Sequence, residues 1–415
     1  MGIVRDTPEL AANYSAITAT YSRESRSNTD TTSLNSISSL TDSSASTSSI
    51  YSTKQVKLTL VDKENIRRMY QELDPDKMWK LSTGTVVEKK MEEFALSCCY
   101  EHPVHSLIFD TNDKSWASYF TKEEIKEITM YKPKKLDELP DVLNNYIEDL
   151  KKLRDVDTLK KKLSEETTCS ACEWVRYTVL DYFKLFKYGY LPLSDQTEDD
   201  MMRRIWFFID TVFDASPIHC RGGEKSSKSS STSKNINRVL SAVEKIKRKM
   251  VGRKVDLLFL RQSLEYGCCE CGRYDVPTKE LHDGGFKMTK VLKDMLYCLY
   301  KSAPDVLRHV ALPGFLLFET KFTVILCDAP AGHVCRIIRS KTMNLPEEPD
   351  EIYNQLFSIL TLVYKSRLLM ENTRNLVRQV PVTVEFDQME YNTLPPCYYP
   401  DFIKQKRRRN NNEED

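Results

Sequence analysis

Two acids lie within neighbouring apolar stretches of "VGRKVDLLFLRQSLEYGCCECGR", residues 251–273: Asp256 and Glu270. Burying a carboxylate in an apolar strand costs free energy unless a partner compensates its charge. If the stretches are adjacent strands, alternation allows these acids to converge on one face, with Glu265 on the other. Converging carboxylates repel unless a cation lies between them, and oxygen ligands of this kind suit Mg²⁺ or Mn²⁺. The pair therefore predicts a divalent metal site that activates water for attack on a phosphoryl group.

The elements that would position this pair are two short strands, 254–260 and 265–271. An amphipathic helix is expected before them over 236–250, with Val239, Val243, Ile246 and Met250 facing inward, and another after them over 285–302. Two further strand regions follow, at about 311–327 and 333–339. The order helix, strands, helix, strands predicts a mixed α/β domain.

The rest of the chain divides by composition. Residues 1–56 are rich in Ser and Thr and too poor in apolar residues to fold, so they are expected to be disordered. The other predicted parts are a mostly helical N-terminal region (57–220), a Ser/Lys-rich loop (221–235), the α/β core (236–345), a C-terminal helix and strand (346–395), and a basic and then acidic tail (396–415).

The pattern D-x13-E-x-G across two strands, between two helices, resembles the PD-(D/E)xK nuclease-like superfamily. More narrowly, "GRKVDLLF", "EYGCCECGR", "FKMTKVLKDML" and "GFLLFETKFTVILCDAPAGHVCRIIRS" are similar to segments of a group of uncharacterised fungal proteins that carry such a domain. "WKLSTGTVVEKKMEEFALSCCYEHPVHSLIFD" resembles their N-terminal part. The resemblance implies a restriction-endonuclease-like α/β core. It makes Asp256 and Glu270 the metal ligands and Glu244 a further acid on the preceding helix.

The chain departs from the family pattern at Gly272, where the resemblance calls for a lysine. That lysine orients the attacking water or stabilises developing negative charge. Lys287 and Lys290, on the helix that follows, are the candidates to replace it. Arg273 is adjacent to Gly272 but belongs to the other face of a regular strand.

Each of these features also has a structural interpretation. Asp256 and Glu270 are equally consistent with ion pairs to Arg253, Lys254 or Arg273 at strand ends. A basic strip of Lys249, Arg253, Lys254 and Arg273 predicts contacts with nucleic-acid phosphates, but a solvated protein surface has the same composition. Glu244 is most simply the helical partner of Lys247 and Arg248.

The twelve cysteines indicate reduced thiols in an intracellular protein, because the start MGIVRDTPEL lacks the apolar core of a signal peptide. Cys169-x-x-Cys172 together with Cys268, Cys269 and Cys271 suggests zinc, but a second well-spaced ligand pair is missing. Buried thiols explain these cysteines more simply.

The formal net charge of +1 gives no global argument for nucleic acid, and no apolar run is long enough to span a membrane. "KQKRRR" (404–409) is consistent with nuclear import or a nucleic-acid-binding arm. Two functions remain open. One is metal-dependent hydrolysis of DNA or RNA. The other is a non-catalytic interaction or nucleic-acid-binding scaffold, with the N-terminal helices as the surface for a protein partner.

Overall fold

The fold is a mixed α/β arrangement around an eight-stranded sheet, in a computed structural model of the protein. The residues described are 56–153, 155–193, 196–240, 242–243, 245–246, 248–273, 282–380 and 393–400. The helices and the mixed sheet confirm the prediction of a mixed α/β fold. Four predictions fall outside the described residues. They concern the disordered tail (except Val56), the strand expected after the C-terminal helix, Glu244 and "KQKRRR".

The sheet has the strand order β1-β7-β6-β5-β4-β3-β2, and β8 pairs with β6. Neighbours β3 and β4 are antiparallel, and β4 and β5 are parallel. The predicted strands of the core are present, with the region 311–327 divided into a hairpin. The bounds are β1 (Ile108–Asp110), β2 (His219–Ser226), β3 (Lys254–Arg261), β4 (Leu264–Gly272), β5 (Ala311–Phe318), β6 (Lys321–Asp328), β7 (Cys335–Arg339) and β8 (Met343–Asn344).

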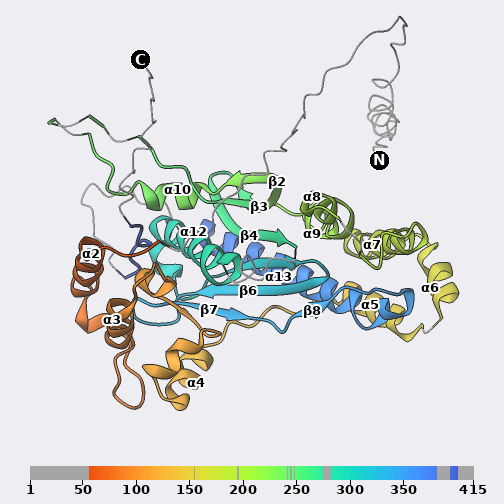
Figure 1. Cartoon of the computed structure of the whole chain (residues 1–415). Helices are drawn as coiled ribbons and strands as arrows, with labels where there is room; N and C mark the ends of the chain where they lie inside the picture. The colour runs from red at the N-terminus through yellow and green to blue at the C-terminus, as the bar shows by residue number, and fades with distance from the viewer. Residues whose placement is uncertain are drawn as a thin grey trace, which may run out of the picture. The chain divides into compact units, whose positions relative to one another are not determined.

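Two long helices cover opposite faces of the sheet: α12 (Met288–Ser302) and α13 (Leu356–Gln379) (Figure 1). Two glycines in the strands show which helix covers each face of the sheet. A Cβ at Gly314 would meet Met288 and Leu292 of α12, whereas one at Gly267 would meet Met370 of α13. Almost every residue of α12 is buried, because the helix is also covered on its outer side by α10 (Lys228–Lys234) and the N-terminal region.

The N-terminal region builds a second apolar cluster around Trp79, Phe94 and Trp116, and contributes β1 to the sheet edge beside β7. The helices of this region are α2 (Leu60–Gln71), α3 (Val87–Ser97), α4 (Lys122–Met130), α5 (Asp141–Lys152), α6 (Val156–Leu163), α7 (Ser170–Lys187), α8 (Glu198–Asp200) and α9 (Phe208–Thr211).

Two predictions for residues 221–250 are wrong. The segment 221–235, expected to be a polar loop, completes β2 and forms α10, whose Ser229, Ser230 and Ser233 are buried. The segment 236–250, expected to be an amphipathic helix, has no helix among its described residues. An apolar helical face is stable only when it packs against something, and in this fold α10 occupies the position beside α12.

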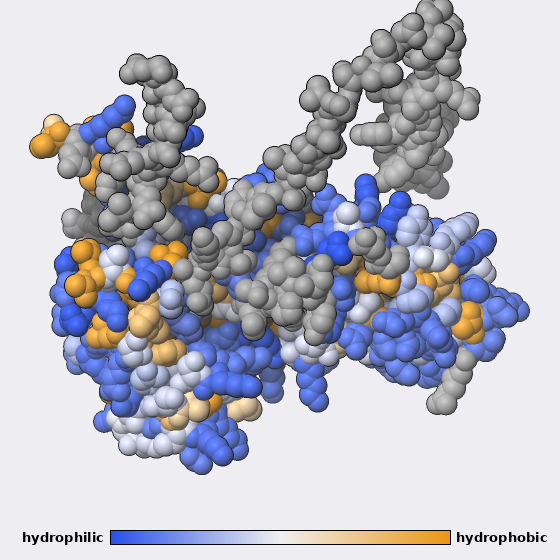
Figure 2. All heavy atoms as spheres, in the orientation of Figure 1, coloured by the Kyte–Doolittle hydropathy of each residue, from blue (hydrophilic) through white to orange (hydrophobic). Residues whose placement is uncertain are grey.

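The apolar side chains of this segment are consequently exposed: Val239 by 72%, Leu240 by 85% and Val243 by 95%. Figure 2 shows apolar residues on the segment that projects beside α10 in Figure 1. Across the described part of the chain, no helix combines the length and apolar character needed to cross a membrane.

Candidate functional site

Asp256 and Glu270 lie on facing positions of neighbouring strands. The β3–β4 ladder pairs Leu257 with Cys269, so the next step of the same register places Asp256 across from Glu270. Their shared face is the one covered by α12, because the Cys268 thiol lies 3.5 Å from the Met288 sulfur. The sheet therefore brings the two predicted acids together.

Glu265 does not lie on the opposite face, as regular alternation predicted. A β-bulge shifts the register between Phe259 and Leu260, which inserts an extra residue into β4 and changes the alternation of its first residues. Glu265 consequently turns towards α10 on the α12 side. Its carboxylate accepts hydrogen bonds from the Ser227 hydroxyl at 2.7 Å and from the Lys228 N–H at 2.7 Å.

Lys287 completes the acid pair from outside the strands. Its ammonium lies 2.7 Å from Glu270 Oε2. Lys287 ends the short π-helix η6 (Asp283–Lys287) that leads into α12. Gly284 allows η6 to approach the sheet, since a Cβ there would lie 2.9 Å from Leu316 Cδ1, and Leu316 is the register partner of Glu270. Gly284 thus lets η6 lie close enough to the sheet for Lys287 to reach Glu270.

The pKa values of Glu270 and Lys287 depend on burial and on the charges around them. Burial raises the pKa of Glu270 well above its ordinary value; the Lys287 ammonium opposes this rise, and Asp256 and Asp283 add to it. Burial disfavours the charge of Lys287, but Glu270 and Asp283 raise its pKa overall. Asp283 was not singled out from the sequence, because it belongs to no periodic pattern.

The carboxylate oxygens have the character of a site for a hard divalent cation. Glu270 Oε1 is buried and has no hydrogen-bond partner in the structure, while the half-buried Asp256 accepts the Cys271 N–H through Oδ2 at 2.6 Å. Among described residues, no group of three or more His, Cys, Asp or Glu side chains is placed to hold a metal ion. Mg²⁺ needs fewer, since it often binds through one or two carboxylates, with water and substrate phosphate completing its shell. Asp256 and Glu270 therefore fit Mg²⁺ or Mn²⁺.

Gly272 has no room for the lysine that the family pattern requires. A Cβ at this position would lie 2.6 Å from Cε1 of Phe318, its register partner in β5. The Phe318 ring thus fills the space into which a side chain at 272 would project.

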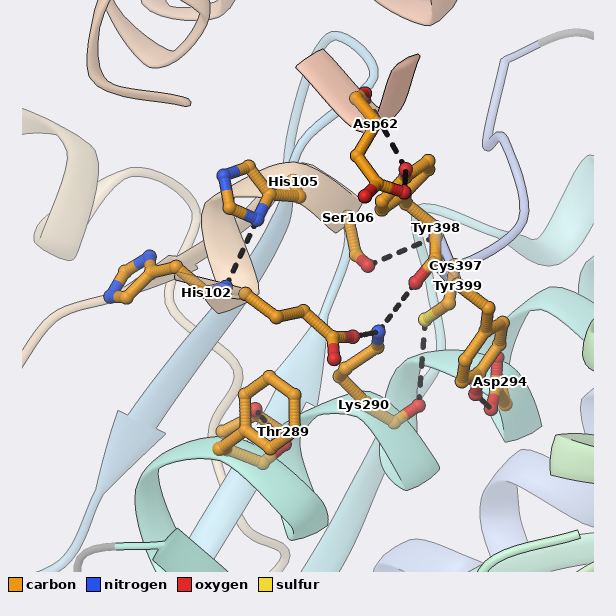
Figure 3. A network of polar contacts seen from close by, with 12 residues as sticks. Asp62, His102, His105, Ser106, Thr289, Lys290, Asp294, Cys397, Tyr398 and Tyr399 are labelled. Carbon is orange, nitrogen blue, oxygen red and sulfur yellow. Dashed lines mark hydrogen bonds and ion pairs between the residues drawn. The ribbon is translucent and has the colours of Figure 1, made fainter. Parts of the chain in front are cut away.

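The prediction that Lys290 could replace the missing lysine is wrong, because its side chain does not reach Asp256 or Glu270. Its fully buried ammonium lies 2.6 Å from Glu101 Oε1 and donates to the Tyr398 carbonyl at 2.5 Å (Figure 3). Lys290 lies in α12, where Glu101 of the N-terminal region takes its ammonium, whereas Lys287 lies at the end of η6.

The contacts around Lys290 join three distant parts of the chain (Figure 3). The Tyr398 hydroxyl donates to Asp62 Oδ1 at 2.7 Å, and the Tyr399 hydroxyl donates to Asp294. Lys290 lies 4.2 Å from the centre of the Tyr399 ring. This network fastens residues 393–400 between α2 and α12, so its charges serve the packing of the fold.

The four predicted nucleic-acid contacts are not collected into one strip. The Arg253 guanidinium lies 5.0 Å from the Phe286 ring centre, and Lys254 pairs with Glu224 at 2.9 Å. Lys249 lines a cavity beside β2 and β3, whereas Arg273 lines a different one with Glu319 and Glu347.

The cysteines suggested for zinc lie mostly inside the protein. Cys268, Cys269 and Cys271 are buried in β4, and burial raises the pKa of the Cys268 and Cys269 thiols well above the ordinary value. Cys172 is buried on α7, and burial raises its pKa to about 12. These neutral thiols behave as small apolar side chains.

Comparison with known proteins provides no relative: no protein-family profile, curated protein or solved structure matches this chain.

Proposed function

We propose that this protein is a metal-dependent phosphodiesterase acting on DNA or RNA, with a PD-(D/E)xK-like core. The observation that carries the proposal is the 2.7 Å contact between Lys287 and Glu270, on the strand position facing Asp256. An acid pair with a lysine is the set of groups that the family resemblance requires. Here the lysine comes from the helix after the strands.

The arrangement of elements supports a restriction-endonuclease-like core. The hairpin of β3 and β4 carries one acid on each strand, and α12 then crosses to β5, which is parallel to β4. The crossover places the start of α12 beside the acid-bearing end of β4. A lysine at the start of this helix is therefore well placed to substitute for one on the strand.

Each side chain has a defined part in the proposed reaction. Asp256 and Glu270 would hold Mg²⁺ or Mn²⁺, which supplies Lewis-acid stabilisation of phosphoryl charge and lowers the pKa of bound water. Lys287 keeps a positive charge beside Glu270, where it offsets negative charge that develops on a phosphodiester. Its side chain is 22% exposed, so the ammonium is accessible to a substrate, whereas Glu270 at 3% forms the floor of the site.

A nuclease assay with labelled single-stranded and duplex DNA and RNA, in Mg²⁺ or Mn²⁺, tests the proposal. The wild type should cleave at least one substrate, and Asp256→Asn, Glu270→Gln and Lys287→Met should each lower the rate at least about 100-fold. Lys152→Met, which alters an exposed lysine of α5 outside the site, is the matched control and should retain most of the activity. Equal activity in the wild type and all three site variants would contradict the assignment.

A second candidate function is a non-catalytic scaffold with the same fold. It is favoured by the burial of Glu270, because Lys287 already compensates the carboxylate without any metal. On this alternative the wild type cleaves nothing, and Mg²⁺ does not shift the unfolding midpoint of the wild type more than that of Asp256→Asn.

A further inference from the structure

A cavity of about 510 Å³ lies on the sheet face that carries Asp256 and Glu270. It is bounded by the edge strand β2, by β3, by the start of α10 and by residues 249–252. Gly252 allows this last segment to close against α10, because a Cβ there would meet the Ser227 carbonyl oxygen at 1.9 Å. The volume is in the range of small-ligand sites, which span about 300–1,000 Å³.

Three cations line this cavity on the face of Leu258: Arg221, Lys228 and Lys249. Lys225 also borders it, but its register partner Val255 belongs to the other face of the sheet. None of their side chains forms a hydrogen bond or ion pair with the part of the protein that the structure describes. The one acid in the lining, Glu265, is already engaged by Ser227 and the first N–H groups of α10. The cavity therefore has a concentrated positive charge in a chain whose formal net charge is only +1.

The floor of the cavity is apolar and belongs to the strand of the acid pair. Leu258 and Leu260 line it, and Leu258 is buried with Cys268 as its register partner. Leu258 follows Asp256 by two residues, and Cys268 precedes Glu270 by two. Because residues two apart in a strand share a face, the cavity lies next to the acid pair on the same face of the sheet. A ligand with an anionic part and a flat apolar part would match the cations and the leucines together.

We propose that this cavity binds a nucleotide, with phosphates on Arg221, Lys228 and Lys249 and the base against Leu258 and Leu260. The nucleotide is either free or one unit of a single strand, since both present the same chemistry. The inference goes beyond the proposed hydrolysis, because binding here does not require Asp256, Glu270 or a metal. If the ligand is a single strand of nucleic acid, the cavity would hold the nucleotides next to the nucleotide that reaches Asp256 and Glu270.

Binding is measured in EDTA, so that its outcome is separate from cleavage. Fluorescence anisotropy of a labelled thymidine oligonucleotide of about 12 units is followed from about 50 to about 200 mM salt. Three phosphate contacts on a single strand predict a slope of about −2.1 in log K against log salt, or about 20-fold weaker binding over this range. The exposed double variant Lys228→Ala/Lys249→Ala should reduce the slope to about −0.7. Competition by thymidine monophosphate decides whether the free nucleotide also enters.

The matched control is Lys122→Ala/Lys126→Ala, which removes two exposed lysines from α4 at the same cost in net charge. It should bind the oligonucleotide like the wild type. The inference is overturned if both double variants lose affinity equally, if neither does, or if vesicles rich in anionic lipid compete as well as the oligonucleotide does. Unfolding midpoints within about 2 °C of the wild type confirm that the variants are folded.

Discussion

The Phe318 ring occupies the space into which any side chain at Gly272 would project, 2.6 Å from the position of a Cβ. The two residues are register partners in the parallel ladder of β4 and β5. A lysine at position 272 therefore has no space in this fold, and the ammonium that does meet Glu270 comes from Lys287.

Gly272→Lys should therefore fail to rescue the activity of Lys287→Met. Even Gly272→Ala should lower the free energy of unfolding by about 1–3 kcal/mol, because Phe318 must move. Gly285→Ala is the control, since a Cβ there meets nothing within 4 Å. Urea denaturation measures both variants. A Gly272→Ala protein as stable as the wild type would show that Phe318 moves freely.

Glu270 should make the protein less stable as pH rises. The carboxyl ionises at about 4.5 in the unfolded chain but has a raised pKa in the folded protein, so above pH 4.5 the folded state binds more protons than the unfolded state. The resulting loss of stability accumulates until the folded pKa is reached, at about 1.4 kcal/mol for each unit of difference. Glu270→Gln lacks this loss.

Urea denaturation at about pH 5 and about pH 8 measures this effect. The stability of Glu270→Gln relative to the wild type should increase between the two conditions. Glu148→Gln, an exposed acid on α5, should show no comparable change. A pH-independent difference for Glu270→Gln would show that Lys287 fully compensates the burial of the carboxylate.

Lys290 should prove essential for stability. Lys290→Met leaves Glu101 buried without its cation, which should cost about 3–5 kcal/mol. Lys290→Met/Glu101→Leu should recover part of this loss, because no buried charge is then left unpaired. Lys287→Met should cost less than Lys290→Met, since Lys287 is partly exposed. Equal losses for the two lysines, measured by urea denaturation, would contradict the division into site and network.

Glu265 should hold α10 in place. Glu265→Gln weakens the hydrogen bonds to Ser227, Lys228 and Ser229, and should lower the free energy of unfolding by about 1–3 kcal/mol. Glu224→Gln removes an acid from the exposed pair with Lys254 and should change stability by less than about 1 kcal/mol. If Glu265→Gln is as mild as Glu224→Gln, the carboxylate does not support α10.

The local sequence was sufficient to predict β3, β4 and α12 and to place Asp256 and Glu270 on one face. These inferences rest on the alternation of apolar residues, which depends only on near neighbours in the chain. The same reasoning failed at Glu265, because a β-bulge changes the alternation without an evident local signal. It also failed for 236–250, where helical spacing of apolar residues has no surface to pack against.

Only the tertiary structure decided between Lys287 and Lys290, which the sequence presented as equivalent. Gly284 lets η6 approach Leu316, so Lys287 meets Glu270, while Glu101 from the N-terminal region takes Lys290. Burial of Ser227, Ser229, Ser230 and Ser233 likewise depends on Glu265 and on the packing of α10 against α12. The periodic pattern of a chain determines which face a residue occupies within its element. Which charge lies opposite it depends on segments far away in the sequence, because a buried ion pair forms only where the fold brings both partners together.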